Sequence, residues 1–157
     1  MINEQNAQIA VANYFEYRRN IIIPSFFFHD YECDVFILSK SGYITEVEIK
    51  LNINDLKKDK NKRKWQCSSR QYIKRFYYAV PSTMIDETKS IIDERYGILS
   101  LQYNEPKQRC FAYLHKDAEI LNKSKPGITE SIKIKMLLSS YHRFWDLHTT
   151  KNLSEGL

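Results

Sequence analysis

The sequence has little glycine and cysteine and no long apolar run, and each shortage excludes a class of protein. Only four of the 157 residues are glycine, and no glycine-rich phosphate-binding loop occurs. The three cysteines form no C-x-x-C pair, which predicts neither a disulfide framework nor a zinc site. No stretch of about 20 apolar residues is present and the N-terminus is polar, so we expect a cytoplasmic protein without a membrane span or signal peptide.

Positive charge is concentrated in one part of the chain. The formal net charge is +5, and the segment from Asp55 to Arg75 holds nine Lys or Arg and two Asp, a segment charge of +7. The rest of the chain is therefore slightly acidic. A dense basic segment of this kind is often a solvated face, and it also suits an acidic partner, most directly nucleic acid.

The stretch from Glu32 to Lys50 predicts two strands joined by a tight turn at Lys40-Ser41-Gly42. Strand alternation would place Tyr31, Cys33, Val35 and Ile37 on one face of the first strand and Glu32, Asp34, Phe36 and Leu38 on the other. If Ser39 lies opposite Tyr43, then Asp34 lies opposite Glu48, and Lys50 is on the same face as Glu48. A bulge would shift this register by one residue.

Two facing carboxylates on a surface fit for burial need a reason, because opposed like charges are destabilising. A divalent cation held by oxygen ligands is one such reason. With Lys50 two residues beyond Glu48, the set is suited to metal-assisted attack on a phosphate. The alternative is an exposed hairpin on which Glu48 and Lys50 simply pair in water.

Four blocks in order resemble a known family. Asp34 and Glu48-Ile49-Lys50, within CDVFILSKSGYITEVEIK, are followed by NDLKKDKNKRKW and RFYYAVP. This set resembles the PD-(D/E)XK nuclease superfamily, and most nearly its MmcB-like branch of DNA-repair endonucleases, over roughly residues 3–101. The resemblance implies a restriction-endonuclease-like α/β fold with an αβββαβ core, and an Mg²⁺- or Mn²⁺-dependent endonuclease acting on DNA in repair or processing.

The resemblance also implies roles for individual residues. Asp34, Glu48 and the backbone carbonyl of Ile49 would hold the metal ion, and Lys50 would orient the attacking water, stabilise negative charge or act as a base. Glu4, on a first helix expected over Asn3 to Arg18, matches an additional metal ligand, although a favourable charge at the helix start explains it as well. Glu46 is either a second ligand or the partner of another charge, and Gln71 is comparable with a glutamine of some related nucleases.

The basic segment would grip the phosphate backbone through Lys57, Lys58, Lys60, Lys62, Arg63, Lys64 and Arg70, of which the first six are too dense to bury. Its aromatic residues Trp65 and Tyr72 either stack on bases or dock a helix onto the core. We expect an interrupted helix here, although the dense charge also permits a mobile loop.

The remaining elements complete a single layered domain, 1–157, with its core at about residues 3–101 and a C-terminal strand and helix at about 109–148. After the basic segment we expect a strand over Arg75–Val80, a helix over Thr83–Tyr96, two strands, and a last helix capped by Thr129. Met136, Leu137, Tyr141, Phe144 and Trp145 form an apolar stripe on that helix, for packing or for an oligomer surface.

Two further readings remain open. A module that keeps the nuclease fold would bind nucleic acid without cutting it, and a purely structural protein would show no salt-dependent DNA binding. If the protein is a nuclease that cuts both strands, it needs two copies or a partner, so a homodimer is one expectation.

Overall fold

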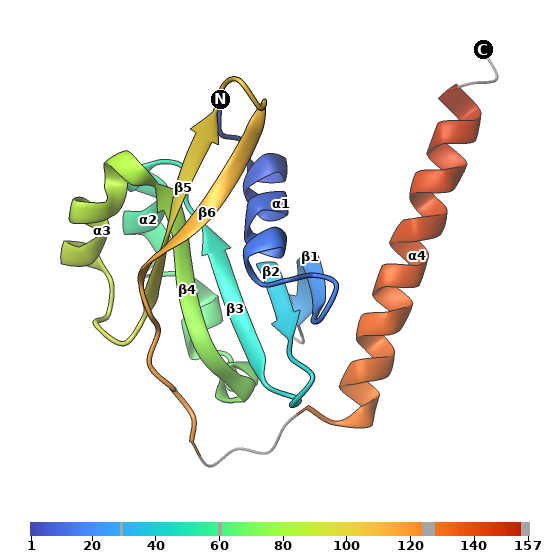
Figure 1. The fold of residues 1–157 in the computed structure, drawn as a ribbon. Helices are drawn as coiled ribbons and strands as arrows, with labels where there is room; N and C mark the ends of the chain where they lie inside the picture. The colour runs from blue at the N-terminus through green and yellow to red at the C-terminus, as the bar shows by residue number, and fades with distance from the viewer. Residues whose placement is uncertain (29, 60, 124–127, 155–157) are drawn as a thin grey trace. The chain divides into compact units, whose positions relative to one another are not determined.

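The computed structural model describes residues 1–28, 30–59, 61–123 and 128–154 (Figure 1). The chain divides into two compact units, Met1–Gly127 and Ile128–Leu157, and each is described by itself. No helix among the described residues is long and apolar enough to cross a membrane.

The described part of the first unit forms one six-stranded mixed sheet in which the strands lie in sequence order. The β1/β2, β2/β3 and β5/β6 pairs are antiparallel, whereas β3/β4 and β4/β5 are parallel. The strands are β1 (Ile21–Phe28), β2 (Tyr31–Leu38), β3 (Ile44–Ile49), β4 (Ile73–Pro81), β5 (Gly97–Asn104) and β6 (Arg109–Lys116). Because parallel neighbours need a crossover, helical segments precede both β4 and β5.

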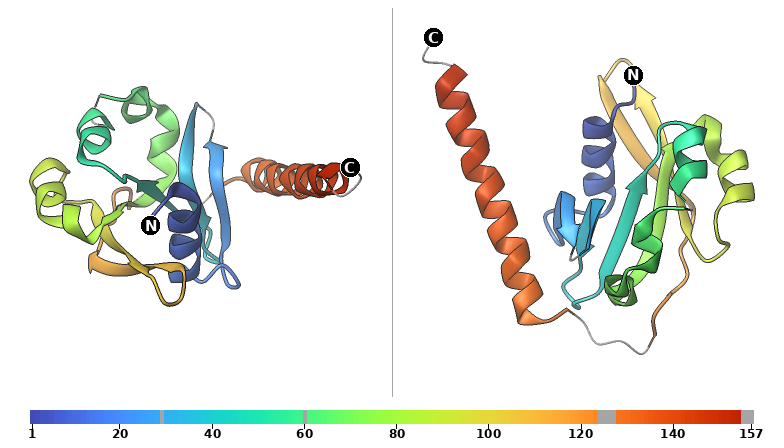
Figure 2. Two further views of the ribbon diagram at one scale, coloured as in Figure 1. Left: turned by 90° about the horizontal axis from the view of Figure 1, so that it is seen from above. Right: turned by 180° about the vertical axis from the view of Figure 1, so that it is seen from behind.

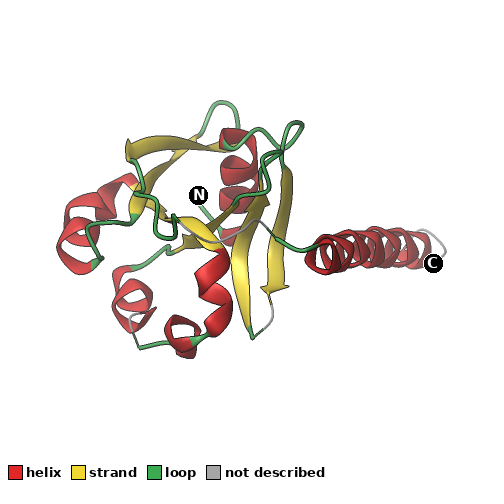
Figure 3. Ribbon diagram, turned by 90° about the horizontal axis from the view of Figure 1, so that it is seen from below, coloured by secondary structure: helices red, strands yellow, loops and turns green. Residues whose placement is uncertain are grey.

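Helices lie on both sides of this sheet, as Figure 2 (left) and Figure 3 show from opposite ends. Helix α1 (Glu4–Tyr14) is on one side. The segments on the other side are α2 (Ile53–Asp59), the 3₁₀ helices η1 (Arg63–Gln66), η2 (Ser68–Tyr72) and η3 (Ser82–Met84), and α3 (Ile85–Ile91). The predicted layered α/β fold is confirmed, and its first six main elements follow the order helix, three strands, helix, strand.

Helix α1 begins where the sequence predicts and ends one turn early. Asn3 is the N-cap, and its side chain and that of Asn6 exchange hydrogen bonds with each other's backbone N–H. The expected continuation to Arg18 is wrong, because Glu16 has a φ of 54° and leaves the helical conformation. Ala7 and Val11 are fully buried against apolar residues of the sheet, as the helical spacing predicts.

The alternation of β1 and β2 shifts by one residue at Ser25 and Asp34. Ser25 has a φ of 46°, and neither residue is among the paired positions of the two strands. Val35 therefore joins the core under α1, whereas the Tyr31 hydroxyl reaches Glu46 on the other face. The predicted common face for Tyr31, Cys33, Val35 and Ile37 is wrong, because a kinked backbone resets the period of two.

The second face of the sheet is lined by aromatic rings. Phe26 and Phe28 each lie 4.9 Å, between ring centroids, from Phe36, and Phe76 lies 5.3 Å from Trp65. Trp65 also stacks on Tyr96 at 5.5 Å. Trp65 therefore docks the basic segment onto the core, which is one of its two expected roles.

Several element bounds differ from the predictions. The expected helix of the basic segment is instead α2 followed by two 3₁₀ turns, and β4 begins at Ile73 rather than Arg75. Helix α3 stops at Ile91 and not at the expected Tyr96, and Gly97, the residue after the expected helix, is the first residue of β5. A Cβ on Gly97 would meet the Tyr77 ring at 2.3 Å, so close packing rather than helix termination explains this glycine.

The second unit contains helix α4 (Glu130–Ser154). The Thr129 hydroxyl accepts a hydrogen bond from the backbone N–H of Ile132 at 3.4 Å, in agreement with the predicted cap. Large apolar side chains on this helix are at least half exposed, namely Ile134, Leu137, Leu138, Tyr141, Phe144, Trp145 and Leu147.

Candidate functional site

The β2/β3 hairpin has the predicted register. Val35 pairs with Val47 and Leu38 with Ile44, and Gly42 in the turn has a φ of 80°. Continuing this register brings Asp34 to the end of β3 where Glu48 and Lys50 lie. There Asp34 Oδ2 accepts a hydrogen bond from the backbone N–H of Ile49 at 2.7 Å. The kink in β2 thus turns the Asp34 carboxylate across the strand pair.

Lys50 lies at the centre of three carboxylates. Its ammonium is 2.6 Å from Glu48 Oε1, 3.4 Å from Asp59 Oδ1 and 3.9 Å from Asp34 Oδ2. Glu48 and Lys50 are almost completely buried, and the Asp34 side chain is 27% exposed. The structure therefore brings together the three residues Asp34, Glu48 and Lys50 that the sequence predicts, in a buried site and not on a wet hairpin face.

The segment after β3 supplies the third of these acids, Asp59, and two more ammonium groups. Asp59, the last residue of α2, is fully buried and its Oδ2 accepts a hydrogen bond from the Tyr78 hydroxyl at 2.8 Å. Lys64 lies 2.9 Å from Glu48 Oε2 and 3.1 Å from Asp59 Oδ2, and Lys62 lies 3.1 Å from Asp59 Oδ1. We call Asp34, Glu48, Lys50, Asp59, Lys62 and Lys64 the acid–lysine cluster.

The cluster holds the pKa values of two aspartates far apart. Burial, together with the charge of Glu48, raises the pKa of Asp34 to about 6. Burial acts on Asp59 in the same direction, but the ammonium groups of Lys64 and Lys50 outweigh it and lower the pKa of Asp59 to about 2. Carboxyl groups whose pKa values are shifted in opposite directions are typical of sites where one group exchanges a proton or a cation.

Lys50 is held in its charged form. Burial alone would lower its pKa, but the negative charge of Glu48 and the hydrogen bond to it, with Asp59 and Asp34 behind, raise the pKa above the ordinary value. A depressed pKa, which would let Lys50 act as a base, is opposite to this direction. The geometry instead favours a permanent positive charge at this position.

A second buried pair lies beside the cluster on the same face of β3. Glu46 is fully buried, accepts a hydrogen bond from the Tyr31 hydroxyl at 2.7 Å, and pairs with Arg70 at 3.2 Å. The Arg70 guanidinium also lies over the Trp65 ring, 4.1 Å from its centroid. Glu46 is thus the partner of a charge, the simpler of its two predicted roles.

The expected nucleic-acid-binding side chains divide into inward and outward groups. Lys64 is almost fully buried, so its predicted exposure is wrong, and Arg70 is only 13% exposed; each pairs with a buried carboxylate. Lys57 pairs with Glu87 on the surface, Lys58 is exposed, and Lys62 is half exposed. Lys60 and the side chain of Arg63 lie outside the described residues.

Gln8, rather than Glu4, is the α1 residue that reaches the site. Its side-chain amide donates to the backbone carbonyl of Asp34 at 3.4 Å and contacts the Ser25 hydroxyl at 3.1 Å. Glu4 is exposed and lies 3.5 Å from the Gln8 amide, and no ion pair or hydrogen bond joins it to the acid–lysine cluster within the described ranges. Gln71 lies in η2.

The donor atoms of the cluster have the chemistry of a magnesium site but are engaged by lysines. Carboxylate oxygens are the ligands that Mg²⁺ and Mn²⁺ prefer. Among the described residues, however, no three acidic, histidine or cysteine side chains form a group arranged for a metal ion. Both oxygens of Glu48 are engaged by ammonium groups, Oε1 by Lys50 and Lys62 and Oε2 by Lys64.

Sequence reasoning did not place Asp59, Lys62 and Lys64 in the site. The signal was present, since the block NDLKKDKNKRKW carries all three and was part of the family resemblance. Their density of charge instead predicted a solvated face. Only the return of the chain over the second face of β3 brings them to Glu48.

Comparisons with known proteins place the fold but not the chemistry. No family model and no curated protein sequence matches the chain. The structure is similar to that of SPO1766, a protein of unknown function from Silicibacter pomeroyi, with a TM-score of 0.70 and 18% sequence identity over 96% of this chain and 94% of that one. At this identity the likeness shows a shared α/β fold alone.

Proposed function

We propose that the protein is a metal-dependent nuclease that hydrolyses phosphodiester bonds in DNA, in repair or processing, with the acid–lysine cluster as its active site. The observation that carries the proposal is the convergence of Asp34, Glu48 and Lys50 at the adjoining ends of β2 and β3. The order of elements around them, helix, three strands, helix, strand, supports the same family resemblance.

Each residue would have a distinct role. Asp34, whose pKa is raised to about 6, is largely ionised at neutral pH and has one oxygen, Oδ1, without a hydrogen bond to any described residue. Asp34, Glu48 and the Ile49 carbonyl would hold Mg²⁺ or Mn²⁺, which when bound lowers the pKa of a water molecule and offsets charge on the phosphate.

Lys50 would act on the phosphate by charge rather than as a base, because its pKa is raised and it remains protonated. Lys62 is the half-exposed ammonium of the cluster and contacts both Asp59 and Glu48. It would therefore meet the substrate first. Asp59, fully buried and held by Tyr78, would keep Lys50 and Lys64 in position.

The alternative is a module that binds nucleic acid without cutting it. Three carboxylates and three ammonium groups balance each other in the cluster, which is an arrangement that also serves structure alone. In that case the exposed Lys57, Lys58 and Lys62 would bind the phosphate backbone and no metal would be needed.

Cleavage of labelled single-stranded, duplex and branched DNA, and of RNA, with Mg²⁺, Mn²⁺ or EDTA tests the proposal. We expect metal-dependent cleavage by the wild type and a loss of about 100-fold or more in Glu48→Gln and Lys50→Met. Lys107→Met is the control, because it removes the same charge as Lys50→Met but at an exposed residue on the β5–β6 turn. This variant should cleave normally. If neither the wild type nor Lys107→Met cleaves any substrate, and DNA binding persists in EDTA, the nuclease proposal is wrong and the binding module is favoured.

A further inference from the structure

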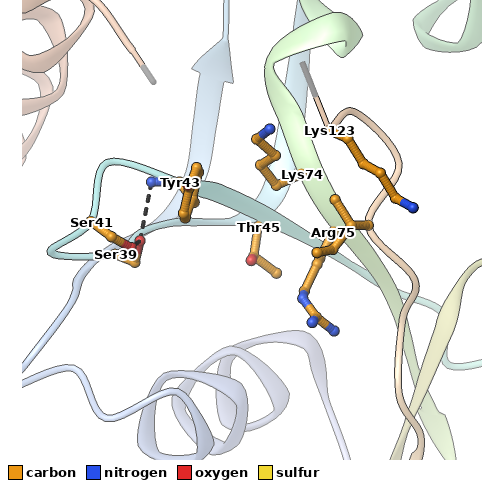
Figure 4. A pocket seen from close by; sticks show the side chains of 8 residues that line it. Ser39, Ser41, Tyr43, Thr45, Lys74, Arg75 and Lys123 are labelled. Carbon is orange, nitrogen blue, oxygen red and sulfur yellow. Dashed lines mark hydrogen bonds between the residues drawn. The ribbon is translucent and has the colours of Figure 1, made fainter. Parts of the chain in front are cut away.

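A basic pocket lies at the other end of β3 from the acid–lysine cluster. Its volume is about 460 Å³, within the usual range for small-molecule sites. Thr45 in its floor is five residues before Lys50, about 17 Å along the strand, and lies on the opposite face from Glu46 and Glu48. The pocket is lined by Ser39, Ser41, Tyr43, Thr45, Lys74, Arg75, Ile120 and Lys123 (Figure 4).

The pocket is built around an irregularity in β4. Ile44 pairs with Ile73 but Thr45 pairs with Arg75, so Lys74 is an extra residue with no partner position on β3. Bulges of this kind re-aim a side chain. Figure 4 shows that Lys74 and Arg75 consequently leave β4 in different directions and border the pocket at different points.

The chain after β6 closes one side of the pocket. The backbone N–H of Leu121 donates to the Lys74 carbonyl at 2.9 Å, and the Asn122 side chain donates to the Ile73 carbonyl at 2.8 Å. These bonds hold Ile120 and Lys123 opposite the β2–β3 hairpin. On the hairpin side, the Ser39 hydroxyl accepts from the Tyr43 backbone N–H at 3.1 Å and lies 2.9 Å from the Ser41 hydroxyl.

Lys74 is a buried cation to which no described acidic side chain is paired. The residue is 9% exposed, and its ammonium donates to the Asn122 carbonyl and lies 5.2 Å from the centroid of the Tyr43 ring. No ion pair joins Lys74 or Lys123 to an acidic side chain within the described ranges, whereas Arg75 pairs with Asp117 at 3.0 Å. Removing an ammonium from water is unfavourable unless an opposite charge compensates it.

An oxyanion bound in the pocket would supply the opposite charge that Lys74 lacks. Three cationic side chains and the hydroxyls of Ser39, Ser41 and Thr45 surround the pocket, and none of the described residues that line it is acidic. Tyr43 and Ile120 add an apolar wall on which a ring can pack. We propose that this pocket binds the phosphate group of a small phosphorylated ligand of nucleoside monophosphate size, independently of the nuclease site.

Isothermal titration calorimetry with AMP and with inorganic phosphate, both in EDTA, tests the proposal. The wild-type protein should bind AMP saturably, and Lys74→Met should weaken that binding at least tenfold. Lys123→Gln, an exposed change that spares the fold, should weaken it severalfold. Glu48→Gln and the surface control Lys107→Met should bind like the wild type, which separates this site from the proposed active site.

Comparing AMP with inorganic phosphate separates binding of the phosphate group from binding of the nucleoside. Weaker binding of inorganic phosphate than of AMP, with the difference removed by Tyr43→Leu, would assign the ring contact to Tyr43. Equal binding of both probes would support a site for the phosphate group alone and overturn the nucleoside part of the proposal. The whole proposal is overturned if neither probe binds, or if correctly folded Lys74→Met and Lys123→Gln both bind AMP as the wild type does.

Discussion

Asp34 Oδ2 accepts the backbone N–H of Ile49 at 2.7 Å, so a side chain of β2 bonds to the backbone of β3 where their regular pairing has ended. This bond depends on the kink at Ser25 and Asp34, which turns the carboxylate across the hairpin. It fixes Asp34 beside Lys50 and Glu48, at the cost of burying a carboxylate near another one. Stability and the proposed function therefore make opposite demands on Asp34.

Replacing Asp34 by Asn should stabilise the protein at alkaline pH. The pKa of Asp34 is raised from 3.8 to about 6 in the folded state, so the folded protein binds more protons than the unfolded chain between these values. The contribution of Asp34 to the free energy of unfolding is fully present below about pH 4 and is lost as the pH rises through 6. Asn keeps an oxygen for the Ile49 N–H and does not ionise.

Urea unfolding of both proteins between pH 4 and pH 8 checks this expectation. The curves should nearly coincide at pH 4, and Asp34→Asn should be the more stable at pH 8. A variant that is less stable at pH 8, with the same pH dependence as the wild type, would contradict the proposed environment of Asp34. Under the nuclease proposal the stabilised variant should also lose cleavage.

Asp59→Asn should have the opposite effect on stability. The pKa of Asp59 is lowered from 3.8 to about 2, so its contribution is present above about pH 4 and is lost as the pH falls through 2. Removing the carboxylate leaves Lys64 buried without half of its partners, at a cost of about 3 to 5 kcal/mol.

Asp55→Asn on the same helix is the matched control for Asp59→Asn. Asp55 is exposed, and its hydrogen bonds are to the side chain of the neighbouring Asn52. Its replacement should change the free energy of unfolding by less than about 1 kcal/mol. Equal effects of the two substitutions in chemical denaturation at pH 7 would show that Asp59 is not the buried anchor described above.

Lys64 and Lys58 should behave differently although both belong to the basic segment. Lys64→Met should lower stability by about 3 kcal/mol, because Glu48 and Asp59 would lose an internal cation. Lys58→Met should leave stability unchanged. If nucleic acid binds to this segment, Lys58→Met should also reduce the slope of log affinity against log salt concentration by about one.

Thermal melts together with DNA titrations at several salt concentrations distinguish these two lysines. Loss of DNA affinity in a stably folded Lys64→Met variant, with the salt slope reduced as for a surface lysine, would contradict the inward role of Lys64. The Glu87→Gln variant, which frees Lys57 from its surface pair, serves as a control for nonspecific charge effects.

Gly97→Ala should destabilise the protein by about 1 to 3 kcal/mol. The new methyl would meet the Tyr77 ring at 2.3 Å and the Ala118 backbone nitrogen at 2.9 Å. A second substitution, Tyr77→Leu, should recover part of the loss by removing the ring. Urea unfolding of the single and double variants measures this coupling, and additive losses would exclude the Tyr77 contact as the cause.

The sequence by itself determined the fold class, the register of the β2/β3 hairpin and the proximity of Asp34, Glu48 and Lys50. Alternating apolar residues and the turn at Gly42 specify the β2/β3 pairing, because a slip by one residue would exchange the two faces of the sheet. Local patterns also sufficed for the Asn3 cap and for the buried stripe of α1.

Only the tertiary structure decided which charges are internal. The pattern of the basic segment predicts exposure for Lys64, since dense charge is normally solvated, and a phosphate-binding role for Arg70. Their burial depends on Glu48 and Glu46 of β3, which lie far away along the chain, and for Lys64 also on the nearby Asp59 at the end of α2. The kink at Asp34 and the bulge at Lys74 likewise arise from pairing between strands, which the period of a single strand does not encode.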